Sequence, residues 1–129
     1  MSAETALLLL TLFTIKHLVV DFLWQPEYEW KNKGTYGHPG GIQHSMKHIA
    51  ASAWLLFLVF PKEEDLSGKM MLALTAGEFV IHYHMDWFKM NLNKWKGWGA
   101  NTHCQFWYMV GFDQFVHMMT YIGMVYFLV

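Results

Sequence analysis

Four long apolar segments dominate this 129-residue chain and limit the folds that it can adopt. They cover residues 3–24, 42–60, 69–89 and 104–129. Each is close to the roughly 20 helical residues that cross a hydrocarbon layer of ~30 Å. The segments lack strand alternation and are too long for barrel strands, and lipid admits only helices or closed barrels. We therefore predict an all-α, polytopic membrane protein: a four-transmembrane-helix bundle that residues 1–129 form as a single domain.

The composition indicates that lipid is a partner. The chain is 54% hydrophobic and 15% charged, whereas soluble domains carry about 25% charged residues. A chain this short cannot bury all of its Phe, Trp, Met and Leu side chains in its own core. Its net charge of −1 gives no electrostatic basis for binding nucleic acid, so we expect a bilayer and no nucleic acid as partner.

The connectors determine how the segments are arranged. Residues 26–41, 61–68 and 90–101 are polar and predict loops. Short loops favour an up-down-up-down bundle, which brings the end of the first segment and the start of the second to one membrane face. That face carries more lysines, so the positive-inside rule places it in the cytoplasm and both termini outside. The first segment has no basic stretch ahead of it, so we expect a retained helix and not a signal peptide.

Every segment carries one pair of His or Asp residues four positions apart, which places both side chains on one helix face. At a rise of 1.5 Å per residue, the pairs lie ~10 Å below the same interface. Aspartate in a membrane helix costs ~2.5–3.5 kcal/mol and usually faces a cavity. We therefore predict that eight side chains converge in a polar interior. They are His17, Asp21, His44, His48, His82, Asp86, Asp113 and His117.

Imidazole and carboxylate groups together favour a divalent metal, with zinc preferred and manganese or iron also compatible. Two such groups at i, i+4 chelate one ion. Carboxylates that do not bind the metal would orient the ligands or act as the general base. The candidates for catalysis are Asp21, Asp86, Asp113 and Glu78. Glu78 alternatively forms a structural ion pair with Lys16, and the sequence leaves open which of the eight residues bind the metal.

These motifs also carry a resemblance. They are His17-x3-Asp21-Phe22-x2-Gln25, a Gly40-Gly41 turn before His44 and His48, His82-x3-Asp86-x2-Lys89, and Asp113-Gln114-x2-His117. In this order, over nearly the whole chain, they resemble a family of bacterial and phage membrane proteins, the domain of unknown function 3307. The family is more distantly similar to membrane-bound metal-dependent hydrolases. The resemblance implies an integral protein of the bacterial inner membrane with a metallohydrolase-like site.

The favoured hypothesis is a metal-dependent hydrolase that acts on a phosphoester or lipid head group from the cytoplasmic face. Gln25, Lys89 and Gln114 are the candidate substrate-binding residues, although Lys89 alternatively extends to the interface. One rival is a proton or divalent-metal transport pathway, and another is a redox protein with haem or iron. A third is a small phage-type membrane binding or inhibitory protein whose polar cluster only holds the helices together. The oligomeric state stays open.

Overall fold

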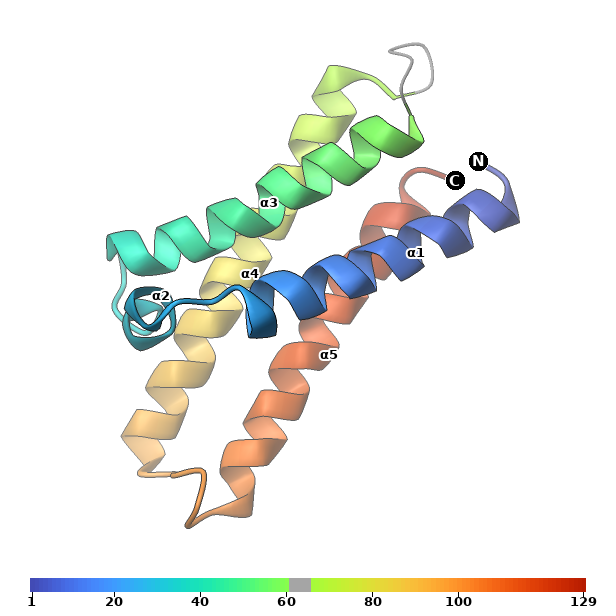
Figure 1. Ribbon diagram of the computed structural model, residues 1–129. Helices are drawn as coiled ribbons and strands as arrows, with labels where there is room; N and C mark the ends of the chain where they lie inside the picture. The colour runs from blue at the N-terminus through green and yellow to red at the C-terminus, as the bar shows by residue number, and fades with distance from the viewer. Residues whose placement is uncertain (61–65) are drawn as a thin grey trace.

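The computed structural model describes residues 1–60 and 66–129, and these residues form an all-α fold (Figure 1). The elements are, in chain order, α1 (Ala3–Leu18), the π-helix η1 (Val19–Leu23), α2 (Glu27–Asn32), α3 (Pro39–Val59), α4 (Gly68–Lys96) and α5 (Cys104–Tyr126). Three of the four long helices begin where a side chain accepts a backbone N–H of the first turn, which satisfies a donor that the helix itself leaves free. The capping residues are Ser2, His38 and Ser67.

The four long helices form an antiparallel bundle. α1 packs against α3 and α5, and α4 also packs against both of them, so the four helices surround one interior. Figure 1 shows both termini at one end of the bundle, whereas α2 and the start of α3 lie at the other end. The alternating direction agrees with the arrangement expected from the short connectors.

Two of the expected loops contain helix. The connector 26–41 includes α2, which begins directly after Pro26. α4 continues past Lys89 to Lys96 and ends where Gly97 takes a left-handed conformation with φ of 67°. The loop prediction was wrong for these parts, because polar residues suit an exposed helix as well as a loop. Of the expected connector 61–68, residues 61–65 lie outside the described part of the chain.

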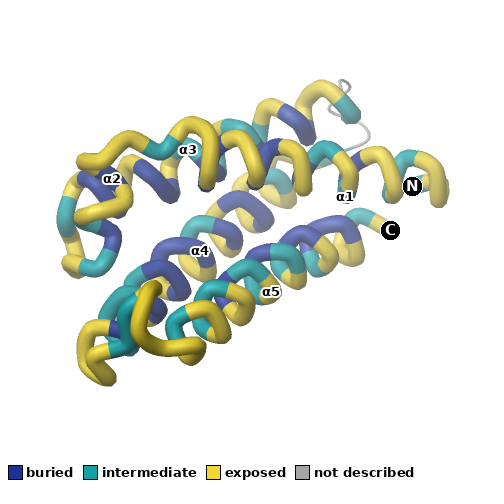
Figure 2. Tube along the Cα trace, turned by 60° about the horizontal axis from the view of Figure 1, so that its bottom comes forward, coloured by how far each residue is buried: buried dark blue, intermediate teal, exposed yellow. Residues whose placement is uncertain are grey.

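The interior of the bundle has an apolar half and a polar half. The apolar half lies toward the termini and is built around Leu9 and Phe13 of α1, Leu56 of α3 and Met124 of α5. The polar half lies toward η1 and α2 and contains buried histidine, aspartate and lysine side chains. Figure 2 shows that the buried positions of the long helices face the interior, while their outer faces are exposed.

The outer surface is rich in large apolar side chains. They occur on every long helix, for example Leu7 and Ile15 of α1, Trp54 and Phe57 of α3, Leu72 and Val80 of α4, and Phe112 and Phe115 of α5. Among the described residues, Ala3–Leu23 is the one helical stretch that is long and apolar enough to cross a membrane. The other long helices carry histidine and charged residues that lower their mean hydropathy, so a four-span arrangement does not follow from hydropathy.

Candidate metal site

The polar half of the interior brings together all eight of the predicted His and Asp residues. Each is at most 7% exposed, and every long helix of the bundle contributes to the cluster, with η1 continuing α1. The residues are His17, Asp21, His44, His48, His82, Asp86, Asp113 and His117. The convergence expected from the i, i+4 spacing is therefore present in the structure.

Two groups within this cluster have ligand atoms that all lie within 4.8 Å of one another. The first group contains Asp21, His44, His48 and His82, and the second contains His82, Asp86 and His117. His82 belongs to both groups. A neutral imidazole offers one lone pair to a metal, so the two groups compete for His82 and one ion at a time is expected.

The first group has the closer contacts. His44 Nε2 lies 3.0 Å from Asp21 Oδ1 and 3.1 Å from His82 Nε2. The His48 and His82 rings are tilted against each other with their centroids 3.9 Å apart. The two nitrogens of His44 and His82, 3.1 Å apart, either share one proton or direct two lone pairs at one cation.

Unpaired nitrogens show that a metal fits these residues. His48 Nε2 is buried without a hydrogen-bond partner among the described residues, and its nearest carboxylate oxygen, on Asp21, is 4.0 Å away. His117 Nε2 likewise makes no hydrogen bond within the described chain, although Asp113 Oδ1 lies 3.2 Å away. A buried unpaired group costs roughly 1–3 kcal/mol. A bound ion would pair with one of these nitrogens, so the donor set suits a metal.

His17 lies beside the two groups and outside both of them. Its Nε2–H donates to Gln114 Oε1 at 2.8 Å, and its Nδ1 accepts from the Tyr121 hydroxyl at 3.0 Å. The Gln114 amide group in turn donates to Asp21 Oδ2 and to Asp113 Oδ2. With both ring nitrogens bonded, His17 is suited to orienting carboxylates through Gln114, and a ligand role for it stays a prediction.

The π-helix η1 positions Asp21. The backbone N–H of Trp24 donates to the carbonyl of Val19 at 2.7 Å, which is the i→i+5 bond of a π-turn. Short π-turns are rare and are frequently found at functional sites. The i, i+4 spacing of His17 and Asp21 assumes a regular α-helix, and the sequence carries no signal for the wider turn.

Glu29 of α2 is a site residue that the sequence analysis missed. It is 1% exposed, and its Oε2 lies 3.4 Å from His44 Nδ1 and 2.6 Å from Lys47 Nζ. A carboxylate behind a metal-binding imidazole fixes the ring and its tautomer, and it leaves Nε2 free for the ion. The run that follows Pro26 has the chemistry of a helix start. That signal locates α2 but does not predict that Glu29 turns inward.

Gly40 and Gly41 allow the α2 segment to approach this closely. A Cβ at Gly40 would lie 2.6 Å from the carbonyl oxygen of Tyr28, and one at Gly41 would lie 3.1 Å from Cα of Lys33. Both glycines belong to the first turn of α3, so the expected Gly-Gly turn is instead the start of a helix. Their lack of side chains lets two backbones meet beside the site.

Two buried lysines hold the three aspartates. Lys33 Nζ lies 3.1 Å from Asp86 Oδ2 and 3.5 Å from Asp21 Oδ1. Lys89 Nζ lies 2.7 Å from Asp113 Oδ2 and 3.1 Å from Asp86 Oδ1. Lys89 therefore turns inward and does not extend to the interface. If the imidazoles are neutral, the three carboxylates and two ammonium groups give the polar half a net charge of −1. A bound divalent cation would change this net charge to +1.

Glu78 and Lys16 form the buried ion pair that was one of the two alternatives. Lys16 Nζ lies 2.5 Å from Glu78 Oε1, donates to the Ser52 hydroxyl at 2.9 Å, and lies 3.5 Å from His48 Nδ1. This layer separates the histidine cluster from the apolar half. Lys16 thus connects Glu78 to the candidate site through His48.

A cavity of about 440 Å³ adjoins the cluster at the end of the bundle that carries η1 and α2. Its polar lining consists of Asp21, Gln25, Lys33, Lys89 and Gln114. Aromatic and aliphatic side chains complete the wall, namely Phe22, Trp30, Met90, Phe106 and Val110. The three candidate substrate-binding residues therefore line one cavity, together with Lys33 from the predicted loop 26–41.

Comparison with known proteins identifies the family. The chain belongs to the family described as Protein of unknown function (DUF3307), whose model matches residues 9–129. Neither the curated proteins nor the solved structures contain a match to the chain. The family description names no activity, so the function must be argued from the site.

Proposed function

We propose that this protein is a single-domain, membrane-embedded, metal-dependent hydrolase that acts on a phosphoester, with an anionic lipid head group as the preferred substrate class. One observation carries the proposal. Buried imidazole and carboxylate donors from all sides of the bundle converge beside a cavity lined by two lysines and two amides. Candidate metal ligands, charged side chains and an open cavity thus occur together at one end of the molecule.

The distribution of polarity supports a membrane location. Eight charged side chains are buried in the interior, while the outer faces of all four long helices carry large apolar side chains, a pattern unusual for a protein that folds in water. Exposed aromatic residues gather at the cavity end, where interfacial side chains are expected, for example Trp24, Trp30, Trp95 and Trp107. Exposed Lys31, Lys94 and Lys96 share this end, which supports a cytoplasmic orientation.

The metal is proposed to bind the group of Asp21, His44, His48 and His82. Three imidazoles and one carboxylate form a donor set that suits zinc best. Among the four, Asp21 also lines the cavity, so a substrate there would lie next to the ion. When bound, a divalent metal supplies Lewis-acid activation of water and of a phosphoryl oxygen.

The protein's own residues would bind and orient the substrate. With a divalent cation present, the unbalanced charge of the polar half becomes positive, which favours an anion in the cavity. Lys33 and Lys89 offer ammonium donors, and the amide groups of Gln25 and Gln114 can orient a head group. Asp86 and Asp113 lie next to Lys89 and are the candidates for accepting a proton during hydrolysis.

The test is hydrolysis in lipid vesicles by the full chain loaded with zinc, manganese or iron. Phosphatase and phosphodiesterase activity would be measured on vesicles that each contain one class of anionic phospholipid. Gln25→Ala, at the partly exposed cavity edge, should raise KM, and Lys94→Gln, an exposed lysine at the same end, should leave the kinetics unchanged. Inactivity on every lipid class tried, with a metal-loaded protein, would count against the proposal.

Transport is the main rival, and the apolar half argues against it. A proton or ion path must continue from the histidine cluster to the opposite end of the bundle. Beyond Lys16 and Glu78, the described interior is closed by Leu9, Phe13 and Leu56, which are fully buried. Metal-dependent ion flux in proteoliposomes would favour transport in spite of this barrier.

A further inference from the structure

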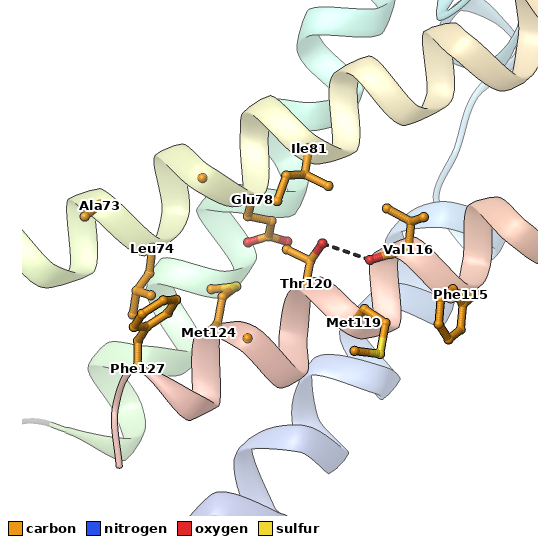
Figure 3. A pocket seen from close by; sticks show the side chains of 12 residues that line it. Ala73, Leu74, Glu78, Ile81, Phe115, Val116, Met119, Thr120, Met124 and Phe127 are labelled. Carbon is orange, nitrogen blue, oxygen red and sulfur yellow. Dashed lines mark hydrogen bonds between the residues drawn. The ribbon is translucent and has the colours of Figure 1, made fainter.

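A second cavity, of about 410 Å³, lies between α4 and α5 on the side of the bundle (Figure 3). Its wall is apolar and includes Ile81, Phe115 and Met119, which are exposed on their outer sides. Small residues create the space, because a Cβ added at Gly77 or Gly123 would meet no atom within 4 Å. The volume is in the range of about 300–1,000 Å³ that is usual for small-molecule sites.

A buried carboxylate forms the inner end of this cavity. Glu78 is 2% exposed, lines the cavity, and turns toward Thr120 of the facing helix (Figure 3). Its Oε1 accepts from Lys16, whereas its Oε2 has no hydrogen-bond partner among the described residues. An unpaired buried acceptor is unfavourable, so a hydrogen-bond donor that reaches Oε2 would bind favourably.

Glu78 and Thr120 are the polar side chains that line this cavity, and neither has a free hydrogen-bond donor. The Thr120 hydroxyl already donates to the carbonyl of Val116 at 2.9 Å, and an ionised carboxylate is an acceptor only. A ligand must therefore supply the donor. Because Lys16 already neutralises Glu78, an ammonium ligand would leave an unbalanced charge among apolar walls, and a carboxylate ligand would repel Glu78. A neutral hydroxyl avoids both costs.

We propose that this cavity binds a neutral long-chain alcohol, whose apolar chain lies between α4 and α5 and whose hydroxyl donates to Glu78 Oε2. Met124 also lines the inner part of the cavity, and its flexible unbranched side chain can move to admit the hydroxyl. Oε1 keeps its bond to Lys16 in this arrangement. The site is separate from the proposed metal and does not depend on hydrolysis.

The experiment uses the full chain in detergent and a hexadecanol probe that carries a photoactivatable diazirine. Hexadecanoic acid and hexadecylamine with the same diazirine serve as matched probes, and mass spectrometry locates the crosslinks. The alcohol should label the α4 and α5 peptides that line the cavity about tenfold more than the acid or the amine, as one satisfied hydrogen bond predicts. Equal labelling by the three probes would overturn the proposal.

A filled cavity provides the decisive variant. Gly77→Leu/Gly123→Leu places side chains into open space, and it should abolish labelling by the alcohol. Gly111→Leu is the control, because a Cβ there also meets no atom within 4 Å while Gly111 does not line the cavity. Labelling that survives in the filled variant, or a chain-to-chain crosslink in place of a lipid adduct, would also overturn the proposal. Unchanged helix content, measured by circular dichroism, would show that the filled variant is folded.

Discussion

The two halves of the bundle interior are built from the same four helices by opposite rules. The apolar half packs Leu9, Phe13 and Leu56 with few polar atoms. The polar half buries three aspartates, five histidines and two lysines at a comparable depth. Packing explains the first half without reference to function. Burying the charged groups of the polar half costs desolvation energy, and packing contacts do not compensate for this cost. This indicates that the polar half is maintained for binding or chemistry.

The boundary between the halves should be the most sensitive place in the interior. Lys16→Met would leave the Glu78 carboxylate buried without its partner. Removing one partner of a buried ion pair typically lowers the free energy of unfolding by about 3–5 kcal/mol. We expect a loss of this order in the free energy of unfolding, measured by denaturation in detergent.

The double variant Lys16→Met/Glu78→Met is the matched control. Replacing both partners by apolar residues is usually neutral or stabilising, so it should recover most of the lost stability. A single variant as stable as the wild type would contradict a structural role for this pair.

In the apolar half, the stability change on substitution should depend on the side-chain volume that is removed. Leu56→Ala leaves a cavity, and large-to-small core changes cost about 2–5 kcal/mol. If the helices lie in a membrane, as proposed, apolar solvent would already surround them when unfolded, so part of the transfer energy would not be lost and a value of ~2 kcal/mol is expected. Thermal unfolding in detergent measures the effect, with exposed Leu58→Ala as the control. Metal content should stay unchanged, and its loss would show that the two halves are not independent.

Behind the metal site, the expected effect is on metal affinity and not on stability. Glu29→Gln keeps the size of the side chain but removes the charge beside His44. Loss of such a supporting carboxylate typically lowers metal affinity 10–100-fold. Competition with a chelator would measure the change, and Glu27→Gln, exposed on the same helix, should have none. Equal affinity in the two variants would remove Glu29 from the site.

The features of the two halves that follow from sequence periodicity were predicted from the sequence. The pairs at i, i+4 predicted the convergence of eight side chains, and the apolar segments predicted the long helices. Glu29 and Lys33 were not predicted as site residues, because they lie in a connector whose packing depends on Gly40 and Gly41. The π-turn at Asp21 was also missed. It directly follows α1, and the sequence carries no signal for it.

The most direct measurement is the metal content of the detergent-purified wild type beside two histidine variants of α4. His82 is shared by both candidate groups, whereas His84, two residues on, is exposed and bonds to Tyr36. We predict one zinc, manganese or iron ion per chain in the wild type and in His84→Ala, and its loss in His82→Ala. A folded wild type that holds no metal, even after dialysis against each ion, would contradict the metal site and leave the polar half as a helix-packing network.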